Sequence, residues 1–180
     1  MRCGACLRDA PPFDAAVAAV DYAYPWDRML RRLKFDAELD LAPTLAMLLA
    51  DAVDAAGEPS PDLVVPVPLS AARIRERGFN QAWELARRAH HRAQADVLLR
   101  VKDTPQQSEL PREKRAANVR NAFAVEPSHA ARVRSADIAV VDDILTSGAT
   151  TAEIARVLKH AGAKRVRLWV VARTPAPDGA

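Results

Sequence analysis

The segment that most constrains the fold is an apolar run in the last third of the chain, followed at once by two aspartates. Residues 138–141 read Ile-Ala-Val-Val, a continuous apolar stretch typical of a central parallel strand. Thr150 to Ala161 has helical character and stops at Gly162, and Lys164 to Val171 predicts another strand. Strand, tight loop, helix and strand form a βαβ unit, which favours an α/β fold with a parallel sheet flanked by helices.

The rest of the chain supplies further elements of the same kind. The pattern predicts strands at Asp14–Tyr24, in the first half of Leu63–Leu69 and at Asp96–Val101, and helices at Trp26–Phe35, Leu39–Ala56 and Asn80–Arg92. Asn80 is the expected N-cap of its helix. Lys102 to Asn121 is polar and weakly periodic, which predicts a long loop carrying a short helix after Pro111.

Composition places the chain among ordinary globular proteins. With 180 residues, 49% hydrophobic and 27% charged, it predicts one domain, expected over residues 13–174, with a disordered tail at 175–180. No apolar run approaches the roughly 18 residues of a membrane span. The start of the sequence has no apolar region typical of a secretory signal. We therefore expect a cytoplasmic protein without membrane insertion.

The two aspartates and the residues after them carry the predicted chemistry. Asp142 and Asp143 follow the apolar strand, where ligands of open α/β sheets bind. The segment Thr146–Thr150 is small and hydroxylated and leads into a helix. Its backbone N–H groups, with the helix N-terminus, predict a cradle for an anion such as phosphate.

Two carboxylates beside a phosphate cradle would repel the phosphate unless they face another group. Ribose hydroxyls donate hydrogen bonds that carboxylates accept, and Mg²⁺ or its waters also bind carboxylates. One segment would then hold both ends of a ribose 5-phosphate. The competing interpretation, a Walker B strand, needs a Gly-x-x-x-x-Gly-Lys-Ser/Thr loop, which the six glycines of the chain do not form.

At this point a resemblance becomes specific. Val140–Thr150 resembles the phosphoribosyl pyrophosphate (PRPP) motif of type I phosphoribosyltransferases. Other segments, in order along nearly the whole chain, resemble the ComF/GntX-like branch of these enzymes. They are Leu33-Lys34-Phe35, Val65-Pro66-Val67-Pro68-Leu69 with Arg73 and Arg77-Gly78-Phe79-Asn80-Gln81, and Gln107, Leu110, Arg115, Asn118 and Phe123.

The resemblance implies roles for individual residues. Asp142 and Asp143 would hold the ribose hydroxyls, and Thr146, Ser147, Gly148, Ala149 and Thr150 would hold the 5-phosphate. The segment from Pro68 to Arg77 resembles the loop that contacts pyrophosphate, with Arg73 and Arg77 as candidates and Lys34 able to reach the same anion. In a mobile hood at Lys102–Asn121, Lys114 and Arg115 would steady departing pyrophosphate. The implied activity is transfer from PRPP with Mg²⁺, and Asp142, Asp143, Lys114 and Arg115 are the catalytic candidates.

Basic clusters agree with an anionic partner, although solvated helix faces explain any single cluster as well. Arginines and lysines crowd three stretches: 28–34, 73–92 and 112–120. A second functional interpretation is therefore a competence or DNA-uptake accessory protein that binds single-stranded DNA or protein partners, with a regulatory or vestigial PRPP site. Aromatic residues make up 5% of the chain, and single-stranded nucleic acid sites need stacking aromatics. The sequence therefore favours a small phosphorylated ligand.

The N-terminus departs from the family pattern. The relatives that the resemblance implies carry two C-x-x-C pairs in a zinc ribbon, whereas this sequence has one pair, Cys3 and Cys6. Two interpretations stay open: residues 1–12 are a truncated remnant of that ribbon, or the two thiols are chemically idle. A structural zinc site needs four ligands, so we assign no metal ligands here. The acceptor substrate and the oligomeric state also stay open.

Overall fold

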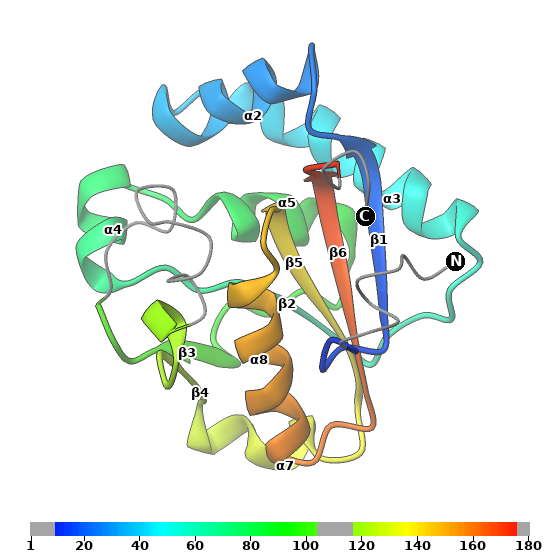
Figure 1. The fold of residues 1–180 in the computed structure, drawn as a ribbon, viewed down its shortest axis with the longest axis vertical. Coiled ribbons are helices and arrows are strands. Elements are labelled where there is room, and N and C mark those ends of the chain that lie inside the picture. Colours follow the sequence, from blue (N-terminus) through cyan, green and yellow to red (C-terminus); the bar gives the residue numbers. More distant parts are fainter. Residues whose placement is uncertain (1–9, 104–116, 176–180) are drawn as a thin grey trace.

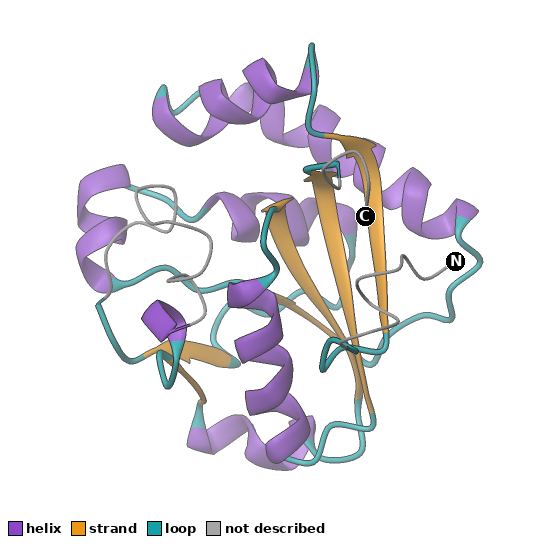
Figure 2. Cartoon of the chain, viewed as in Figure 1, coloured by secondary structure: helices purple, strands orange, loops and turns teal. Residues whose placement is uncertain are grey.

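The computed structural model describes residues 10–103 and 117–175, which form a parallel sheet covered by helices on both faces (Figure 2). In chain order the elements are β1 (Ala15–Asp21), α2 (Trp26–Phe35), η1 (Leu39–Leu41), α3 (Ala42–Ala55), β2 (Leu63–Pro66), α4 (Ala71–Arg77), α5 (Gln81–Ala89), β3 (Leu98–Arg100), β4 (Phe123–Val125), η3 (Pro127–His129), α7 (Ala130–Val133), β5 (Asp137–Leu145), α8 (Ala149–His160) and β6 (Arg165–Arg173).

The main sheet has the strand order β1-β6-β5-β2, and every neighbouring pair is parallel. Val140 of β5 lies beside Leu168 of β6 on one side and Val65 of β2 on the other. β3 and β4 form a separate antiparallel pair. The predicted α/β class with a parallel sheet is confirmed, and the carboxyl ends of all four strands meet at one edge (Figure 1).

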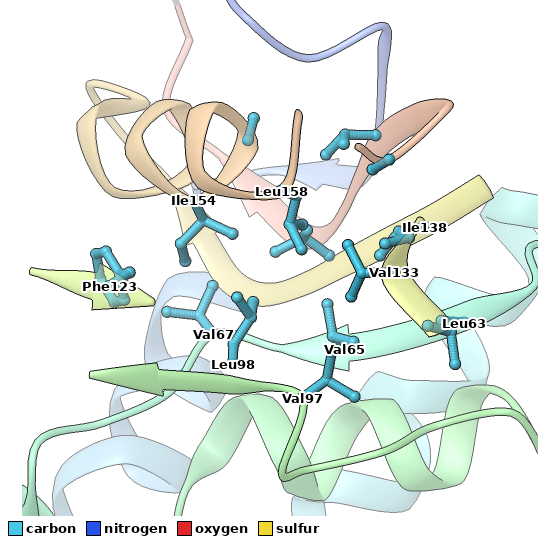
Figure 3. Close-up of a cluster of buried hydrophobic side chains, with 14 of the residues drawn as sticks. Leu63, Val65, Val67, Val97, Leu98, Phe123, Val133, Ile138, Ile154 and Leu158 are labelled. Atoms are coloured by element: carbon cyan, nitrogen blue, oxygen red, sulfur yellow. The ribbon is translucent and has the colours of Figure 1, made fainter. Parts of the chain in front are cut away.

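The two faces of the sheet bury separate apolar clusters, because successive side chains of a strand point to opposite faces. Ile138 and Val140 of β5 pack in the cluster that includes Ile154 and Leu158 of α8 (Figure 3). Ala139 and Val141 face the other cluster, which contains side chains of α2, α3 and α5. A strand covered on both faces needs an apolar residue at every position, and this explains the unbroken run at 138–141.

Helix α2 lies beyond the carboxyl ends of the strands (Figure 1). Its bounds agree with the prediction, because a proline precedes it and apolar residues recur at helical spacing. Leu30 and Leu33 are fully buried, and the basic residues between them face outward or toward the site. The helix therefore covers one end of the sheet while keeping several charges accessible.

Several predicted bounds are wrong. β5 extends to Leu145, so Asp142 and Asp143 lie inside the strand and not in the loop after it. Part of the segment predicted as a pyrophosphate loop is helix α4, capped by the Ser70 side chain. β4, η3 and α7 were not predicted, and α5 ends at Ala89 rather than Arg92.

Part of the predicted hood at Lys102–Asn121 lies outside the described residues, although residues 117–119 are helical. The cysteine pair and most of the predicted C-terminal tail also lie outside them. Within residues 10–103 and 117–175, no helix combines the length and apolarity that crossing a bilayer requires.

Candidate functional site

A cavity of about 500 Å³ opens at the carboxyl edge of the sheet, within the range of small-molecule sites, roughly 300–1,000 Å³. Three groups of side chains line it. From the β1 side and α2 come Tyr22, Leu30, Arg31, Lys34 and Phe35. From β2, α4, α5 and β3 come Val67, Leu69, Arg73, Arg77, Gln81 and Arg100. The end of β5 and the start of α8 supply Asp142, Asp143, Ile144, Leu145, Thr146, Gly148, Ala149, Thr150 and Thr151.

The predicted aspartate pair lies in this cavity. Asp142 lies beside Val170 of β6 and the register resumes at Ile144, so both aspartates lie within the paired part of β5. Asp143 is buried, and its Oδ2 lies 3.2 Å from the Nζ of Lys34 on α2. The Oδ1 of Asp142 accepts a hydrogen bond from the Asp143 backbone N–H at 2.9 Å. Lys34, predicted to reach pyrophosphate, therefore contacts the aspartate pair.

The two carboxyl groups have opposite electrostatic environments. Burial, and then repulsion from Asp143, raises the pKa of Asp142 well above its ordinary value. Burial also acts to raise the pKa of Asp143, but attraction to Lys34 and hydrogen bonds outweigh it, so this pKa lies below its ordinary value. Attraction from Asp143 raises the pKa of Lys34 despite the opposing effect of burial. Asp143 and Lys34 form a stable ion pair, whereas Asp142 is the carboxyl that holds a proton more readily.

The predicted phosphate cradle connects β5 to α8. Gly148 caps the helix with φ of 74°, a left-handed conformation that glycine adopts without strain. Thr146, Gly148, Ala149 and Thr150 line the cavity, as the sequence predicts. Ser147 is not among the described residues that line it; its Oγ accepts a long bond of 3.5 Å from the Ala149 N–H. Thr151, which was not predicted, lines the cavity and donates its hydroxyl to the Gly148 carbonyl at 3.0 Å.

The β2 side of the cavity carries the arginines that the sequence predicts for pyrophosphate. Arg73 and Arg77 lie on α4, and both line the cavity. The Nη1 of Arg77 donates to the Oε1 of Gln81, a buried residue at the start of α5. Asn80 caps α5, as predicted, by accepting from the Ala82 N–H, and its Nδ2 donates to the Val67 carbonyl. Asn80 and Gln81 thus fix α5 and Arg77 relative to β2.

Arg100, at the end of β3, is a cavity residue that the sequence analysis missed. Burial, and then repulsion from Arg73, lowers the pKa of Arg100, and burial similarly lowers the pKa of Arg77. No local pattern marks Arg100, because the antiparallel pairing of β3 with a distant strand brings it there. Five basic side chains and two carboxylates therefore line the described cavity. An anionic ligand would reduce the repulsion among the basic side chains.

Other predicted site residues lie outside the described part of the chain. They are Lys114 and Arg115, the predicted pyrophosphate contacts of the hood, and Cys3 and Cys6. Among the described residues, no group of three or more His, Cys, Asp or Glu side chains is placed to hold a metal ion. The cavity itself offers two carboxylates, one of them already paired with Lys34.

Comparison with known proteins shows the family of the chain. The family described as "Phosphoribosyl transferase domain" matches residues 45–179. The chain belongs to this family, and the aspartates of β5 and the predicted phosphate cradle lie inside the matched region. The solved structure described as "Structure of the allosteric regulatory enzyme of purine biosynthesis" is similar at 20% identity, with a TM-score of 0.43, over 72% of this chain and 25% of that chain.

Curated relatives cover most of the chain. The DNA utilization protein YhgH of Salmonella typhi is 36% identical over 180 residues, covering 96% of this chain and 78% of the relative. The protein of the same name from Escherichia coli strain K12 is 35% identical with the same coverage. Competence protein F of Haemophilus influenzae is 33% identical over 179 residues, covering 95% of this chain and 78% of the relative. The predicted membership in the ComF-related branch of phosphoribosyltransferases is confirmed.

Proposed function

We propose that this protein binds PRPP and transfers its 5-phosphoribosyl group to an acceptor, with release of pyrophosphate. The observation that carries the proposal is the shared cavity of the Asp142–Asp143 pair, the Thr146–Thr150 cradle and the α4 arginines. A ribose flanked by two separate phosphate groups needs these three surfaces in one cavity. Membership in the phosphoribosyl transferase domain family supports the same ligand class.

Each surface has a distinct part in the proposed reaction. Asp142 and Asp143 accept hydrogen bonds from the ribose hydroxyls, and the cradle donates N–H groups to the 5-phosphate. Arg73 and Arg77 bind pyrophosphate, because a guanidinium fork fits phosphate oxygens. Charge that develops on departing pyrophosphate is then stabilised by groups already in place. Lys114 and Arg115 keep their predicted role at the same leaving group.

The donor set also fits Mg²⁺ that enters with its ligand. Mg²⁺ is commonly held by one or two carboxylates together with substrate phosphates, and the described cavity supplies Asp142 and Asp143. When bound, Mg²⁺ would neutralise part of the charge on the pyrophosphate oxygens. Lys34 keeps Asp143 ionised for this purpose, and Arg73 and Arg77 supply the remaining positive charge.

Thermal unfolding with Mg²⁺, with and without PRPP, tests the proposal. A ligand at 100 times its Kd stabilises by about 2.7 kcal/mol, which raises the Tm of a domain of this size by roughly 5–10 °C. We expect the rise in wild type and its loss in Asp142→Asn/Asp143→Asn. Asp51→Asn/Asp54→Asn on the exposed face of α3 makes the same charge change and should keep it. Normal PRPP stabilisation in the cavity double variant would contradict the ribose assignment.

A second candidate function is binding of single-stranded DNA or of competence proteins, with the PRPP site regulatory or vestigial. The named relatives include a DNA utilization protein and competence protein F. The specific observation that favours DNA is Tyr24, which is 74% exposed and lies beneath the Arg28 guanidinium at 5.2 Å. An exposed ring with a cation over it is the kind of platform on which nucleic acid bases stack.

Fluorescence anisotropy with labelled oligothymidylate at two salt concentrations tests this second candidate. Binding should weaken as the salt concentration rises, because the complex forms with release of counterions from the DNA and added salt opposes that release. Tyr24→Ala should weaken it about 10-fold, which corresponds to the roughly 1–3 kcal/mol of one stacked base. The Asp142→Asn/Asp143→Asn variant should bind DNA as wild type does. Absence of binding at low salt would leave the transferase as the remaining proposal.

A further inference from the structure

One aromatic side chain of the cavity is exposed and has no part in the proposed binding of PRPP. Phe35, the last residue of α2, is 60% exposed and lines the cavity. The same helix buries Leu30 and Leu33 completely, so these two residues already hold it on the sheet. An exposed ring forgoes the stabilisation that burial of an apolar side chain provides. The contacts of the ring therefore indicate what it does at this position.

Two cations from different helices lie over the Phe35 ring. The Nζ of Lys34, on α2, lies 6.0 Å from the ring centroid, and the Cζ of Arg77, on α4, lies 5.9 Å from it. A cation within about 6 Å of a ring centroid is attracted to the negative face of the ring. Phe35 therefore connects α2 with α4 across part of the cavity, through the two basic residues that lie nearest to it.

Without the ring, the two cations would compete for one carboxylate. Lys34 already contacts the Oδ2 of Asp143 at 3.2 Å. Attraction to Asp143 is the largest effect on the pKa of Lys34 and raises it, whereas repulsion from Arg77 acts to lower it. Burial lowers the pKa of Arg77, and attraction to the same Asp143 opposes this effect. Arg77 is thus drawn toward a carboxylate that the proposed function assigns to ribose.

The guanidinium of Arg77 is held from two directions. Its Nη1 donates to the Oε1 of Gln81 at 2.5 Å, and Gln81 is buried at the start of α5. A guanidinium donates hydrogen bonds at its edge and stacks on aromatic rings through its face. Gln81 and Phe35 therefore engage different parts of one group, and further N–H groups of its edge are left for phosphate oxygens.

We propose that Phe35 is a positioning residue for Arg77, whose ring holds the guanidinium where the pyrophosphate group of PRPP binds and keeps it away from Asp143. The inference rests on the proposed function and adds a residue that acts on pyrophosphate through Arg77. It also explains why two segments singled out in the sequence, residues 33–35 and 77–81, meet in the fold. Each supplies one side of the same arrangement.

Calorimetry with Mg²⁺ on the full chain tests the proposal with PRPP and with ribose 5-phosphate, which lacks the pyrophosphate group. Phe35→Leu keeps an apolar side chain and removes the ring, so we expect the Kd for PRPP to rise about 5-fold. The Kd for ribose 5-phosphate should stay within about twofold of wild type. Phe35→Tyr and Phe35→Trp keep an aromatic face and should retain the wild-type affinity for PRPP.

A matched control and a double-mutant cycle separate positioning from general effects. Tyr24→Leu removes another exposed ring that has a cation over it, outside the cavity, and should change neither Kd. If Phe35 acts through Arg77, adding Phe35→Leu to Arg77→Met should change the Kd for PRPP by less than about twofold. A further loss as large as that of Phe35→Leu alone would show that the ring acts independently of Arg77.

The outcomes distinguish this inference from the function on which it rests. Failure of wild type to bind PRPP would overturn both. If wild type binds PRPP but Phe35→Leu binds it equally well, the positioning inference is wrong and the PRPP proposal stands. The same conclusion follows if Phe35→Leu weakens PRPP and ribose 5-phosphate equally, or if the two aromatic replacements bind PRPP as weakly as Phe35→Leu does.

Discussion

The two ends of β5 and β6 contain ionic groups that are arranged in opposite ways. At the amino ends, Arg167 is fully buried, and its guanidinium donates two bonds to one oxygen of Asp137, at 2.9 and 2.7 Å. It also donates to the Pro59 carbonyl at 2.6 Å and contacts Glu58 at 3.3 Å. Two carboxylates and one backbone carbonyl therefore contact the cation, and none of these residues lines the cavity at the carboxyl edge.

At the carboxyl ends of the strands, positive and negative side chains of the described residues are not fully paired. Lys34 pairs with Asp143, whereas Asp142 has a raised pKa. Arg77 and Arg100 line the same cavity, and burial lowers the pKa of each. At the amino ends of the strands, the buried charges are therefore paired with each other within the fold. At the carboxyl ends, part of the positive charge has no ion-pair partner among the described residues and is available to an anionic ligand. Breaking the first cluster should therefore cost more stability than breaking the second, and only breaking the second should weaken ligand binding.

The largest expected effect is on stability, from Arg167→Met. Removing one partner of a buried ion pair leaves uncompensated charges, at a cost of about 3–5 kcal/mol. Urea unfolding should show this loss, and adding Asp137→Leu should restore part of it because the remaining carboxylate is removed. PRPP affinity of the folded protein should stay unchanged, since the cavity is at the other end of the sheet. A loss below about 1 kcal/mol would show that water reaches this cluster.

A smaller effect on stability is expected from Lys34→Met, at the ligand end. The Lys34 side chain is 27% exposed, so we expect a loss of about 1–3 kcal/mol, less than for a fully buried pair. The lowered pKa of Asp143 contributes stability above the ordinary value of 3.8, and this contribution disappears as pH falls through the folded-state pKa. Urea unfolding should therefore separate variant from wild type at neutral pH, and the two should converge in acid. An undiminished difference in acid would point to lost packing of the lysine stem instead.

Much of this arrangement could be predicted from the sequence where the determinants are local. The bounds of α2 follow from a proline and an apolar period, and the Asn80 cap follows from its hydrogen-bonding side chain. The cradle at Thr146–Thr150 was predicted because its small residues and glycine have few other structural uses. Four of its five residues line the cavity, and their role in holding a phosphate stays a prediction.

Features set by distant partners could not be predicted in the same way. The aspartates belong to β5 because β6 continues beside them as far as Arg173, and a single strand does not reveal how long its neighbour is. Helix α4 is short and rich in arginine and buries none of its residues, so it has no apolar stripe to detect. Arg100 reaches the cavity through the pairing of β3 with β4, two strands that lie far apart in the sequence.

The smallest expected effect is an increase in stability, and it distinguishes Asp142 from Asp143. The pKa of Asp142 is raised in the folded state, so its contribution to stability is full below the ordinary value of 3.8 and is lost as pH rises through the folded-state pKa. Asp142→Asn should therefore raise the free energy of unfolding, and with it the Tm, at neutral pH, and should have no such effect in strong acid. The amide oxygen can still accept the Asp143 N–H, so the strand is kept. Asp143→Asn should instead lower stability, because Lys34 loses its partner. Both variants should bind PRPP less tightly, as calorimetry would show. Asp142 would then be a residue that lowers stability but serves binding, and Asp143 a residue that serves both. Equal losses of stability in the two variants would mean that the pair acts as a structural unit, like Arg167 and Asp137.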